Sequence, residues 1–389
     1  MTTTGSPDEA IVASSPLDSA IVRASVTAYG RVVDGVRTAH HDSEARVGPP
    51  GITGPTREER ESLLDALLAP GATRSVGAGR RAVPEAADPF RTCFERDRDR
   101  IKYSRPFRRL AGKCQVFLSP DDSHVRTRLT HTLEVAQVAV SIAEELGLNA
   151  ALAEAIALAH DCGHGPGGHA AEDALSPFVP GGYDHAVYGA DVTLTDLNLT
   201  AEVLDGVRHH SWRLTAPSTP EAEAVSLADR LAYVAHDADD AIRAGIIRPD
   251  DLPGIVRQRL GDRQSAQIRA LIRGVVDASR VTGRVAIDLE VADALDAFRR
   301  FNYERIYHRP AAAVQARRVV DLLAALVEYF ADAPGLIPAV ASGEWAAPTS
   351  GDDDAYAASV HYVSGMTDRF AVATAVRAGL RLGDLPVVL

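Results

Sequence analysis

The sequence predicts an all-α protein, in which a helical core is followed by additional C-terminal helices. From about Pro89 onward, Ala, Leu, Arg and Glu dominate the composition. Apolar residues in this part of the chain recur at intervals of three and four, which is the period of an amphipathic helix. Alternating patterns typical of strands are scarce, and no internal repeat is visible. We therefore expect one mostly helical domain.

Composition and charge limit the classes of function. The chain has 389 residues, 46% hydrophobic and 24% charged, which is globular composition and enough for a large core. Its net charge of −12 argues against a protein that coats DNA. Three cysteines without a CxxC spacing provide no disulfide framework and indicate a reducing compartment. Because signal-peptide features and long apolar runs are also lacking, we expect a cytoplasmic protein without a membrane span.

Changes in composition divide the chain into three parts. Residues 1–85 mix short apolar runs with Gly, Pro, Ser and Thr, and only ESLLDALLAP (61–70) is predicted to be helical. We expect this extension to be partly disordered or draped over a neighbouring part of the protein. Residues 86–250 are predicted to form the core that carries the candidate metal site. Residues 251–389 are predicted to form a C-terminal helical region packed on that core.

Two predicted helices lead into the candidate site. In RLTHTLEVAQVAVSIAEELGLN (128–149), Gly147 is the expected C-cap, and five apolar residues form one stripe. The stripe consists of Leu129, Leu133, Ala136, Val140 and Ala143. The next helix is predicted at 150–161. Its small inward-facing residues would let neighbouring helices approach closely.

A histidine-rich stretch, ALAHDCGHGPGGHAAEDAL (157–175), follows these helices. Adjacent residues such as His160 and Asp161 point about 100° apart on a helix, so both could ligate one metal ion only at a helix end that faces a cleft. The glycines and the proline from Gly163 to Gly168 end the helix at that point. The stretch is therefore either a metal site with its catalytic groups or a solvated loop rich in histidine.

A metal site here needs ligands from other helices. His131 is the best candidate, because nothing about an amphipathic helix requires a histidine at that position. The segment LADRLAYVAHDADDAI (227–242) offers two carboxylates, Asp229 and Asp237, and spacing alone does not choose between them. Two imidazoles and two carboxylates suit Mn²⁺, Fe²⁺, Co²⁺, Ni²⁺, Zn²⁺ or Mg²⁺.

Five blocks of sequence together resemble a known family. They are FERDRDRIKYSRPFRRLAGKCQVF (94–117), RTRLTHTLEVAQ (126–137), AHDCGHGPGGHAAEDAL (159–175), LADRLAYVAHDADDAI (227–242) and SGMTDRFA (364–371). In this order they look like the deoxynucleoside triphosphate triphosphohydrolases, the dGTPase-like proteins among the HD-domain phosphohydrolases. The resemblance covers roughly residues 90–375. It implies an HD-domain helical fold and hydrolysis of a dNTP to a deoxynucleoside and inorganic triphosphate.

The resemblance also implies roles for single residues. The metal ligands would be His131, His160, Asp161 and Asp229, so that Asp229 is preferred to Asp237. His169 and Glu172 match the catalytic pair, which lies on one helical face because the two residues are three apart. His164 matches a further histidine of the same pocket. The residues that match contacts to the phosphates, sugar or base of the substrate are Gln115, Arg128, His185, Arg230, Tyr233 and Asp237.

Three residues depart from the family pattern near the site. Gly167 replaces a usual aromatic residue, Ala186 replaces Asn, and His361 replaces Asp before the YxxGMTD block. These departures put the preference for base and sugar in question. Two alternatives therefore stay open: an HD-domain phosphohydrolase that acts on another nucleotide, such as a specialised-pathway nucleotide or a nucleoside monophosphate, and a protein that senses nucleotides without turnover.

The basic run from Arg91 to Lys113 allows two interpretations. It could be a solvated helix face balanced by Glu95, Asp97 and Asp99, or its arginines could reach phosphates of the substrate or of an effector dNTP between subunits. This run is the only sequence feature that suggests nucleic-acid binding, and the acidic net charge argues against it. The resemblance also implies a homo-oligomer, either a hexamer or a tetramer.

Several other aromatic residues are expected to have structural roles. His209 and His210 are predicted to be surface or structural residues. Three tyrosines are predicted to pack in the core, namely Tyr303, Tyr307 and Tyr329.

Overall fold

The computed structural model describes residues 32–33, 35–40, 44–116 and 124–380, and the chain divides into two units, residues 1–55 and 56–389. In the smaller unit, β1 (Val32–Val33) pairs with β2 (Val36–Arg37) in an antiparallel hairpin. Within the predicted N-terminal extension, residues 1–31, 34 and 41–43 lie outside the described residues, and the helix predicted at 61–70 overlaps α2 (Arg57–Leu67).

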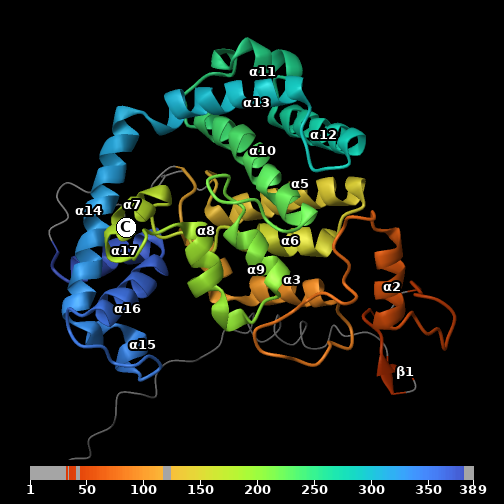
Figure 1. The fold of residues 1–389 in the computed structure, drawn as a ribbon, viewed down its shortest axis with the longest axis horizontal. Coiled ribbons are helices and arrows are strands. Elements are labelled where there is room, and N and C mark those ends of the chain that lie inside the picture. The colour runs from red at the N-terminus through yellow and green to blue at the C-terminus, as the bar shows by residue number, and fades with distance from the viewer. Residues whose placement is uncertain (1–31, 34, 41–43, 117–123, 381–389) are drawn as a thin grey trace, which may run out of the picture. The chain divides into compact units, whose positions relative to one another are not determined.

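The larger unit is all-α over its described residues, as the sequence predicts (Figure 1). Its helices are α2 (Arg57–Leu67), α3 (Cys93–Tyr103), α4 (Arg105–Arg109), α5 (Arg128–Leu146), α6 (Ala150–Ala159), α7 (His169–Leu175), α8 (His185–Tyr188), α9 (Ala201–Arg208), α10 (Pro220–Arg243), α11 (Gly254–Arg259), α12 (Gln264–Thr282), α13 (Leu289–Asn302), α14 (Pro310–Asp332), α15 (Pro338–Ala341), α16 (Asp353–Ser364) and α17 (Asp368–Arg377). Short 3₁₀ turns occupy Leu110–Gly112, Ser176–Phe178, Thr195–Leu197, Pro249–Asp251 and Pro334–Leu336, and single π turns occupy Gly189–Thr193 and Tyr303–Tyr307.

Two hydrophobic clusters hold these helices together. In the first, α5 packs against α6, α10 and α12, and α6 packs against α3 and α9. In the second, α14 packs against α7, α16 and α17. Figure 1 shows the two groups of helices, with α7 beside α14 at the junction. The histidine-rich stretch therefore begins in the first cluster and ends in the second.

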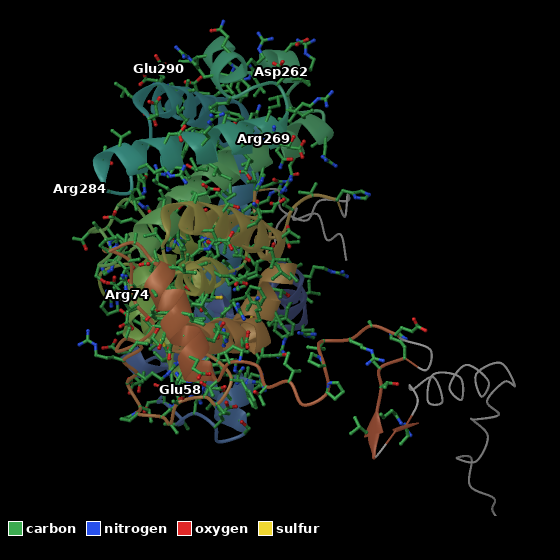
Figure 2. The ribbon with its side chains drawn as sticks, turned by 90° about the vertical axis from the view of Figure 1, so that its right-hand side faces the viewer. Glu58, Arg74, Asp262, Arg269, Arg284 and Glu290 are labelled. Carbon is green, nitrogen blue, oxygen red and sulfur yellow. The ribbon has the colours of Figure 1, made fainter. Side chains whose placement is uncertain are left out.

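Helices α11, α12 and α13 form an outer layer beyond α10. Figure 2 labels exposed charged side chains on this layer, among them Asp262, Arg269, Arg284 and Glu290. Such a charged face is typical of helices that contact their neighbours on one side and solvent on the other.

Side-chain caps fix where the helices near the site begin. Thr127 accepts a hydrogen bond from the backbone of Thr130 at the start of α5, and Asn149 accepts one from Leu152 at the start of α6. Gly147 ends α5 in the left-handed conformation, with φ +65°, which confirms the expected C-cap. The cap at Thr127 starts α5 at Arg128, and His131 therefore lies in the first turn of this helix.

The predicted apolar stripe of α5 is wrong at one position. Ala136 and Ala143 are buried, but Leu133 is 48% exposed. The buried face instead includes Val135 and Ile142, because α5 packs against helices on more than one side. A single stripe of five residues is too narrow for such a helix.

Ion pairs favour the solvated-face interpretation for much of the basic run. Arg91 pairs with Asp88 and Asp99, and Lys102 pairs with Glu154. Asp97, expected to balance this surface, is instead fully buried, where it accepts hydrogen bonds from Arg81 and from the backbone N–H of Thr200. Lys113, at the end of the run, is also buried.

Two further expectations concern the whole described chain. None of the helices in the described ranges combines the length and the apolar character needed to cross a bilayer. All three cysteines are free thiols.

The crossing of α9 over α6 generates a prediction about stability. A Cβ at Gly206 would lie 2.5 Å from Cδ1 of Ile156, so Gly206→Ala forces the isoleucine to move. We expect a loss of about 1–3 kcal/mol in the free energy of unfolding, although alanine favours helices over glycine. Urea unfolding measures this loss.

Two comparisons test the cause of that loss. The second substitution Ile156→Val should recover part of it, because it removes the methyl group nearest the new side chain. Gly71→Ala serves as the control, since a Cβ there meets no atom within 4 Å in the described part of the chain. Equal effects of Gly206→Ala and Gly71→Ala would contradict the prediction.

Candidate functional site

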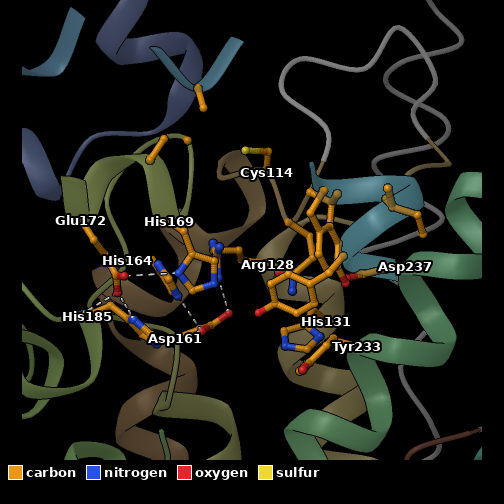
Figure 3. A pocket seen from close by; sticks show the side chains of 18 of the residues that line it. Cys114, Arg128, His131, Asp161, His164, His169, Glu172, His185, Tyr233 and Asp237 are labelled. Atoms are coloured by element: carbon orange, nitrogen blue, oxygen red, sulfur yellow. Dashed lines mark hydrogen bonds and ion pairs between the residues drawn. The ribbon is translucent and has the colours of Figure 1, made fainter. Parts of the chain in front are cut away.

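A cavity of about 620 Å³ lies where the beginning of α5, the end of α6 and the middle of α10 meet the beginning of α7. Its size suits a small-molecule ligand. Figure 3 shows His164, His169, Glu172 and His185 on one side of it and His131 on the other, with Arg128 and Asp161 between these two groups. Almost all of the predicted site residues line this cavity: Gln115, Arg128, His131, Asp161, His164, His169, Glu172, His185, Asp229, Arg230, Tyr233 and Asp237.

The first group contains the predicted metal ligands. His131 Nε2 lies 3.0 Å from Asp229 Oδ1, and His160 Nε2 lies 3.7 Å from the same oxygen. His160 Nε2 also lies 3.4 Å from Asp161 Oδ1. The nitrogen and oxygen atoms of His131, His160 and Asp229 could hold one metal ion, since they lie within 4.8 Å of one another.

The backbone of α6 orients His160. Its Nδ1 lies 2.6 Å from the carbonyl oxygen of Ala157, so the Nδ1–H donates there and Nε2 keeps its lone pair. Nε2 is buried and has no hydrogen-bond partner among the described residues. A buried imidazole nitrogen without a partner is costly unless something binds it. The donor set therefore fits a divalent cation.

Asp161 is a buried carboxylate that lies between Arg128 and His164. Arg128 Nη1 donates to its Oδ2 at 2.8 Å, and His164 Nε2 lies 3.2 Å from its Oδ1. Burial alone would raise the pKa of Asp161, but the neighbouring His160 ring and the guanidinium of Arg128 outweigh burial and hold the pKa well below its usual value. Asp161 is therefore ionised whenever the protein is folded near neutral pH.

In the second group, one carboxylate joins two histidines, and a third histidine stacks on one of them. Glu172 accepts a close hydrogen bond from His185 Nδ1, and its other oxygen lies 3.4 Å from His169 Nδ1. Burial would raise the pKa of Glu172, but hydrogen bonds from His169 and His185 hold it well below its usual value. The His164 and His185 rings stack with their centroids 3.6 Å apart. The His169 side chain is 71% exposed and faces the cavity, so it could reach a bound molecule.

Glycines in the turn between the two groups provide space for close neighbours. A Cβ at Gly163 would lie 2.1 Å from the carbonyl oxygen of His185. A Cβ at Gly168 would lie 2.6 Å from Arg128 Nη2, and the backbone there has φ +64°, which other residues rarely adopt. The guanidinium of Arg128 can reach Asp161 because position 168 has no side chain.

The remaining predicted residues line the side of the cavity nearest α13. Arg230 lies flat on the Trp212 ring, 3.4 Å from its centroid. Tyr233 accepts a hydrogen bond from Arg299 Nε at 2.8 Å. Asp237 accepts one from the Tyr307 hydroxyl and does not approach His131 as closely as Asp229 does.

Gln115 lies at the same cavity. Its Oε1 is buried without a hydrogen-bond partner in the described structure, and such an atom is satisfied when a ligand donates to it. Gln115 therefore offers a buried, unused acceptor to a molecule in the cavity.

Some residues of the site have no signal in the sequence. His210 is buried, and its Nε2 lies 3.2 Å from His185 Nε2, although its neighbours in the chain suggested a surface or structural position. Tyr307, expected in the core, lines the cavity, and Tyr303 is 43% exposed at its rim. Trp212 also lines the cavity. Of the two positions predicted for His210, surface or structural, only the structural one is compatible with its burial.

The three departures from the family pattern lie in different places. Gly167 lines the cavity and has φ +76°, a conformation suited to glycine. Ala186 is fully buried next to His185. His361 lies away from the cavity, where its ring contacts Trp345 at 4.9 Å between centroids.

Comparisons with known proteins identify the class of this fold and site. Residues 128–234 match the HD domain, and residues 285–377 match the phosphohydrolase-associated domain. The protein is therefore an HD-domain protein with the helical fold of that class. The HD domain contains every residue of the first group, and the associated domain contains all of α14, α16 and α17.

Relatives narrow the class to one family. A deoxyguanosinetriphosphate triphosphohydrolase-like protein of Caldanaerobacter subterraneus is 40% identical over 81% of this chain and 93% of its own length. One of Desulfatibacillum aliphaticivorans is 38% identical over 81% of this chain and 94% of its own. A crystal structure of a hypothetical protein from Aquifex aeolicus has 21% identity and a TM-score of 0.43, covering 66% of this chain and 69% of that one. The chain belongs to the deoxyguanosinetriphosphate triphosphohydrolase-like family.

The burial of Asp237 generates a prediction about pH. Burial raises its pKa from 3.8 to about 7, so its protonated form stabilises the fold below pH 3.8, and this contribution is lost as the pH rises through 7. Asparagine cannot ionise. Relative to Asp237→Asn, the unfolding free energy of the wild type should fall by about 1 kcal/mol per pH unit over that interval.

Urea unfolding of both proteins at several pH values between about 4 and about 7.5 measures this difference. The exposed Asp293→Asn is the control and should leave the slope as in the wild type. A difference between wild type and Asp237→Asn that stays constant with pH would contradict the prediction.

Proposed function

We propose that this protein is a metal-dependent triphosphohydrolase that converts a deoxynucleoside triphosphate to a deoxynucleoside and inorganic triphosphate. The observation that carries the proposal is the buried, unpartnered Nε2 of His160, which lies close enough to His131 and Asp229 to share one metal ion with them, beside a ligand-sized cavity that these two residues line. The names of the relatives support a substrate of the dGTP type.

In this proposal His131, His160, Asp161 and Asp229 hold the divalent ion. The mixed set of imidazoles and carboxylates suits Mn²⁺, Mg²⁺, Fe²⁺, Co²⁺, Ni²⁺ or Zn²⁺. When bound, such an ion polarises a phosphate oxygen and lowers the pKa of a coordinated water molecule.

The remaining side chains supply charge and a proton. A triphosphate carries several negative charges, and the guanidinium groups of Arg128 and Arg230 can offset them in the transition state. Attack of water on the α-phosphorus breaks its bond to the 5′ oxygen, which needs a proton to leave as an alcohol. His169 can give that proton, and Glu172 orients its ring through Nδ1.

Residues near α13 would bind the nucleoside. The carboxyl group of Asp237, held by Tyr307, can hydrogen-bond the sugar hydroxyl. Gln115 offers its free acceptor to the sugar or base. Tyr233 and His185 complete the set of proposed substrate contacts.

A second candidate function keeps the same chemistry with another nucleotide. The observation in its favour is Gly167, which leaves the cavity wall without the aromatic side chain usual in the family. Nucleotide sensing without turnover is a weaker candidate, because it leaves the His169 and Glu172 pair without a role.

Association with other molecules stays a prediction as well. A hexamer or tetramer and activation by an effector dNTP are what the family implies. Light scattering tests the oligomeric state, hydrolysis of one dNTP in the presence of a second tests activation, and salt-dependent binding to single-stranded DNA tests the nucleic-acid alternative.

The proposed ligand set predicts the effect of substitutions on metal binding. His160→Ala and Asp229→Asn each remove one ligand, so we expect metal binding to weaken by about 100-fold or more. Elemental analysis and metal titration measure it. His209→Ala, on the neighbouring surface, is the control and should bind the ion as the wild type does. Full metal occupancy in both ligand variants would rule out this ligand set.

The proposed reaction predicts its products. Wild type, incubated with Mn²⁺ or Mg²⁺ and each dNTP and NTP, should release deoxynucleoside and triphosphate in equal amounts. Asp161→Ala should lose both the ion and the activity, whereas His169→Ala should keep the ion and lose about 100-fold or more in kcat. Chromatography of the products measures both. Release of mono- or diphosphates alone would reject triphosphohydrolysis, and hydrolysis of a different nucleotide would favour the second candidate.

A further inference from the structure

The sequence block SGMTDRFA has no part in the reaction proposed above, yet one of its residues contacts two segments of the active site. Asp368 is the first residue of α17. Its Oδ1 accepts a hydrogen bond from the backbone N–H of Gly167 at 2.9 Å, and its Oδ2 accepts one from that of Cys114 at 2.8 Å. One carboxylate therefore joins the turn before His169 to the segment that carries Gln115.

Lys113 connects the same parts of the protein from the other side. Its side chain is buried, and its Nζ donates to the carbonyl oxygen of His164 and, at 2.9 Å, to that of Ser364. The carbonyl oxygen of Lys113 accepts a hydrogen bond from the backbone N–H of Arg128 at 3.0 Å. The junction between α16 and α17, residues 364–368, thus contacts both segments through the side chains of Asp368 and Lys113.

The turn at 165–168 depends on such contacts from outside. Gly167 and Gly168 both have positive φ, at +76° and +64°, and neither has a side chain that could pack against a neighbour. Hydrogen bonds from backbone N–H groups to an ionised carboxylate are stronger than those between neutral groups. Asp368 therefore holds the turn through the backbone of Gly167, where no side chain can do so.

We propose that Asp368, supported by Lys113, is a positioning residue that holds His169 and Gln115 at a fixed separation across the cavity. The inference rests on the proposed function, because it assigns Asp368 an effect on a reaction at that site. It gives the C-terminal helices a role in catalysis: they set the distance between the group that acts on the phosphate end of the substrate and the group at its nucleoside end.

The main variant is Asp368→Asn. Asparagine has nearly the same shape but one acceptor oxygen, so its NH₂ group would face one of the two backbone N–H donors. We expect kcat to fall by about 10- to 100-fold, as is usual when a group that orients a catalytic residue is removed. Bound metal should not change, because none of the proposed ligands contacts Asp368. The matched control is Asp354→Asn, an exposed carboxylate of α16.

Hydrogen exchange provides a measurement that does not depend on turnover. In metal-loaded protein without substrate, peptides that contain Cys114 and Gly167 should exchange faster in Asp368→Asn than in the wild type or the control. Lys113→Met should accelerate exchange in the same turn, and it keeps the test available if Asp368→Asn does not fold.

The outcomes separate this inference from the proposed function. Wild-type kcat in Asp368→Asn, or a loss of kcat matched by an equal loss of bound metal, would overturn the positioning role. Unchanged exchange at both peptides would overturn it as well. If the wild type releases no triphosphate from any dNTP, the proposed function fails, and the exchange measurement alone decides whether Asp368 holds the turn.

Discussion

The structure of the site depends on the buried carboxylate of Asp161. An ionised group without water needs partners of opposite charge or hydrogen-bond donors, and Asp161 finds them in Arg128 and His164. Arg128 begins α5, and Asp161 follows the end of α6, so their ion pair fixes one helix against the other. The position of His160 beside them then follows from the backbone of α6. The histidines of the site are thus arranged around the buried negative charge of Asp161.

Sequence analysis predicted the parts of this arrangement that depend on local rules. The all-α class, the end of α5 at Gly147 and the sharp turn after Asp161 follow from helix periodicity and from glycine, which act over a few residues. The choice between Asp229 and Asp237 needed the resemblance to a family, because both lie on one helix. The structure shows why spacing could not choose: Asp229 approaches His131, whereas Asp237 approaches Tyr307.

Other features depend on packing between distant segments, and local patterns do not contain them. Leu133 is exposed because the helices around α5 leave that direction free. His210 reaches the site because α9 ends beside α6, and only the arrangement of the two helices shows it. Asp368 meets Gly167 across 201 positions of sequence. In each case the packing of distant segments, and not the local sequence, decides what surrounds the side chain.

The glycines of the turn set a limit on how this protein can change. At Gly163 any side chain would collide with the backbone near His185, and at Gly168 it would displace Arg128 from Asp161. Neither collision is with a flexible surface group, so a neighbouring substitution cannot readily relieve it. These two positions should therefore be closed to variation in a mutational library or during evolution. New specificity would have to arise from residues elsewhere on the cavity wall.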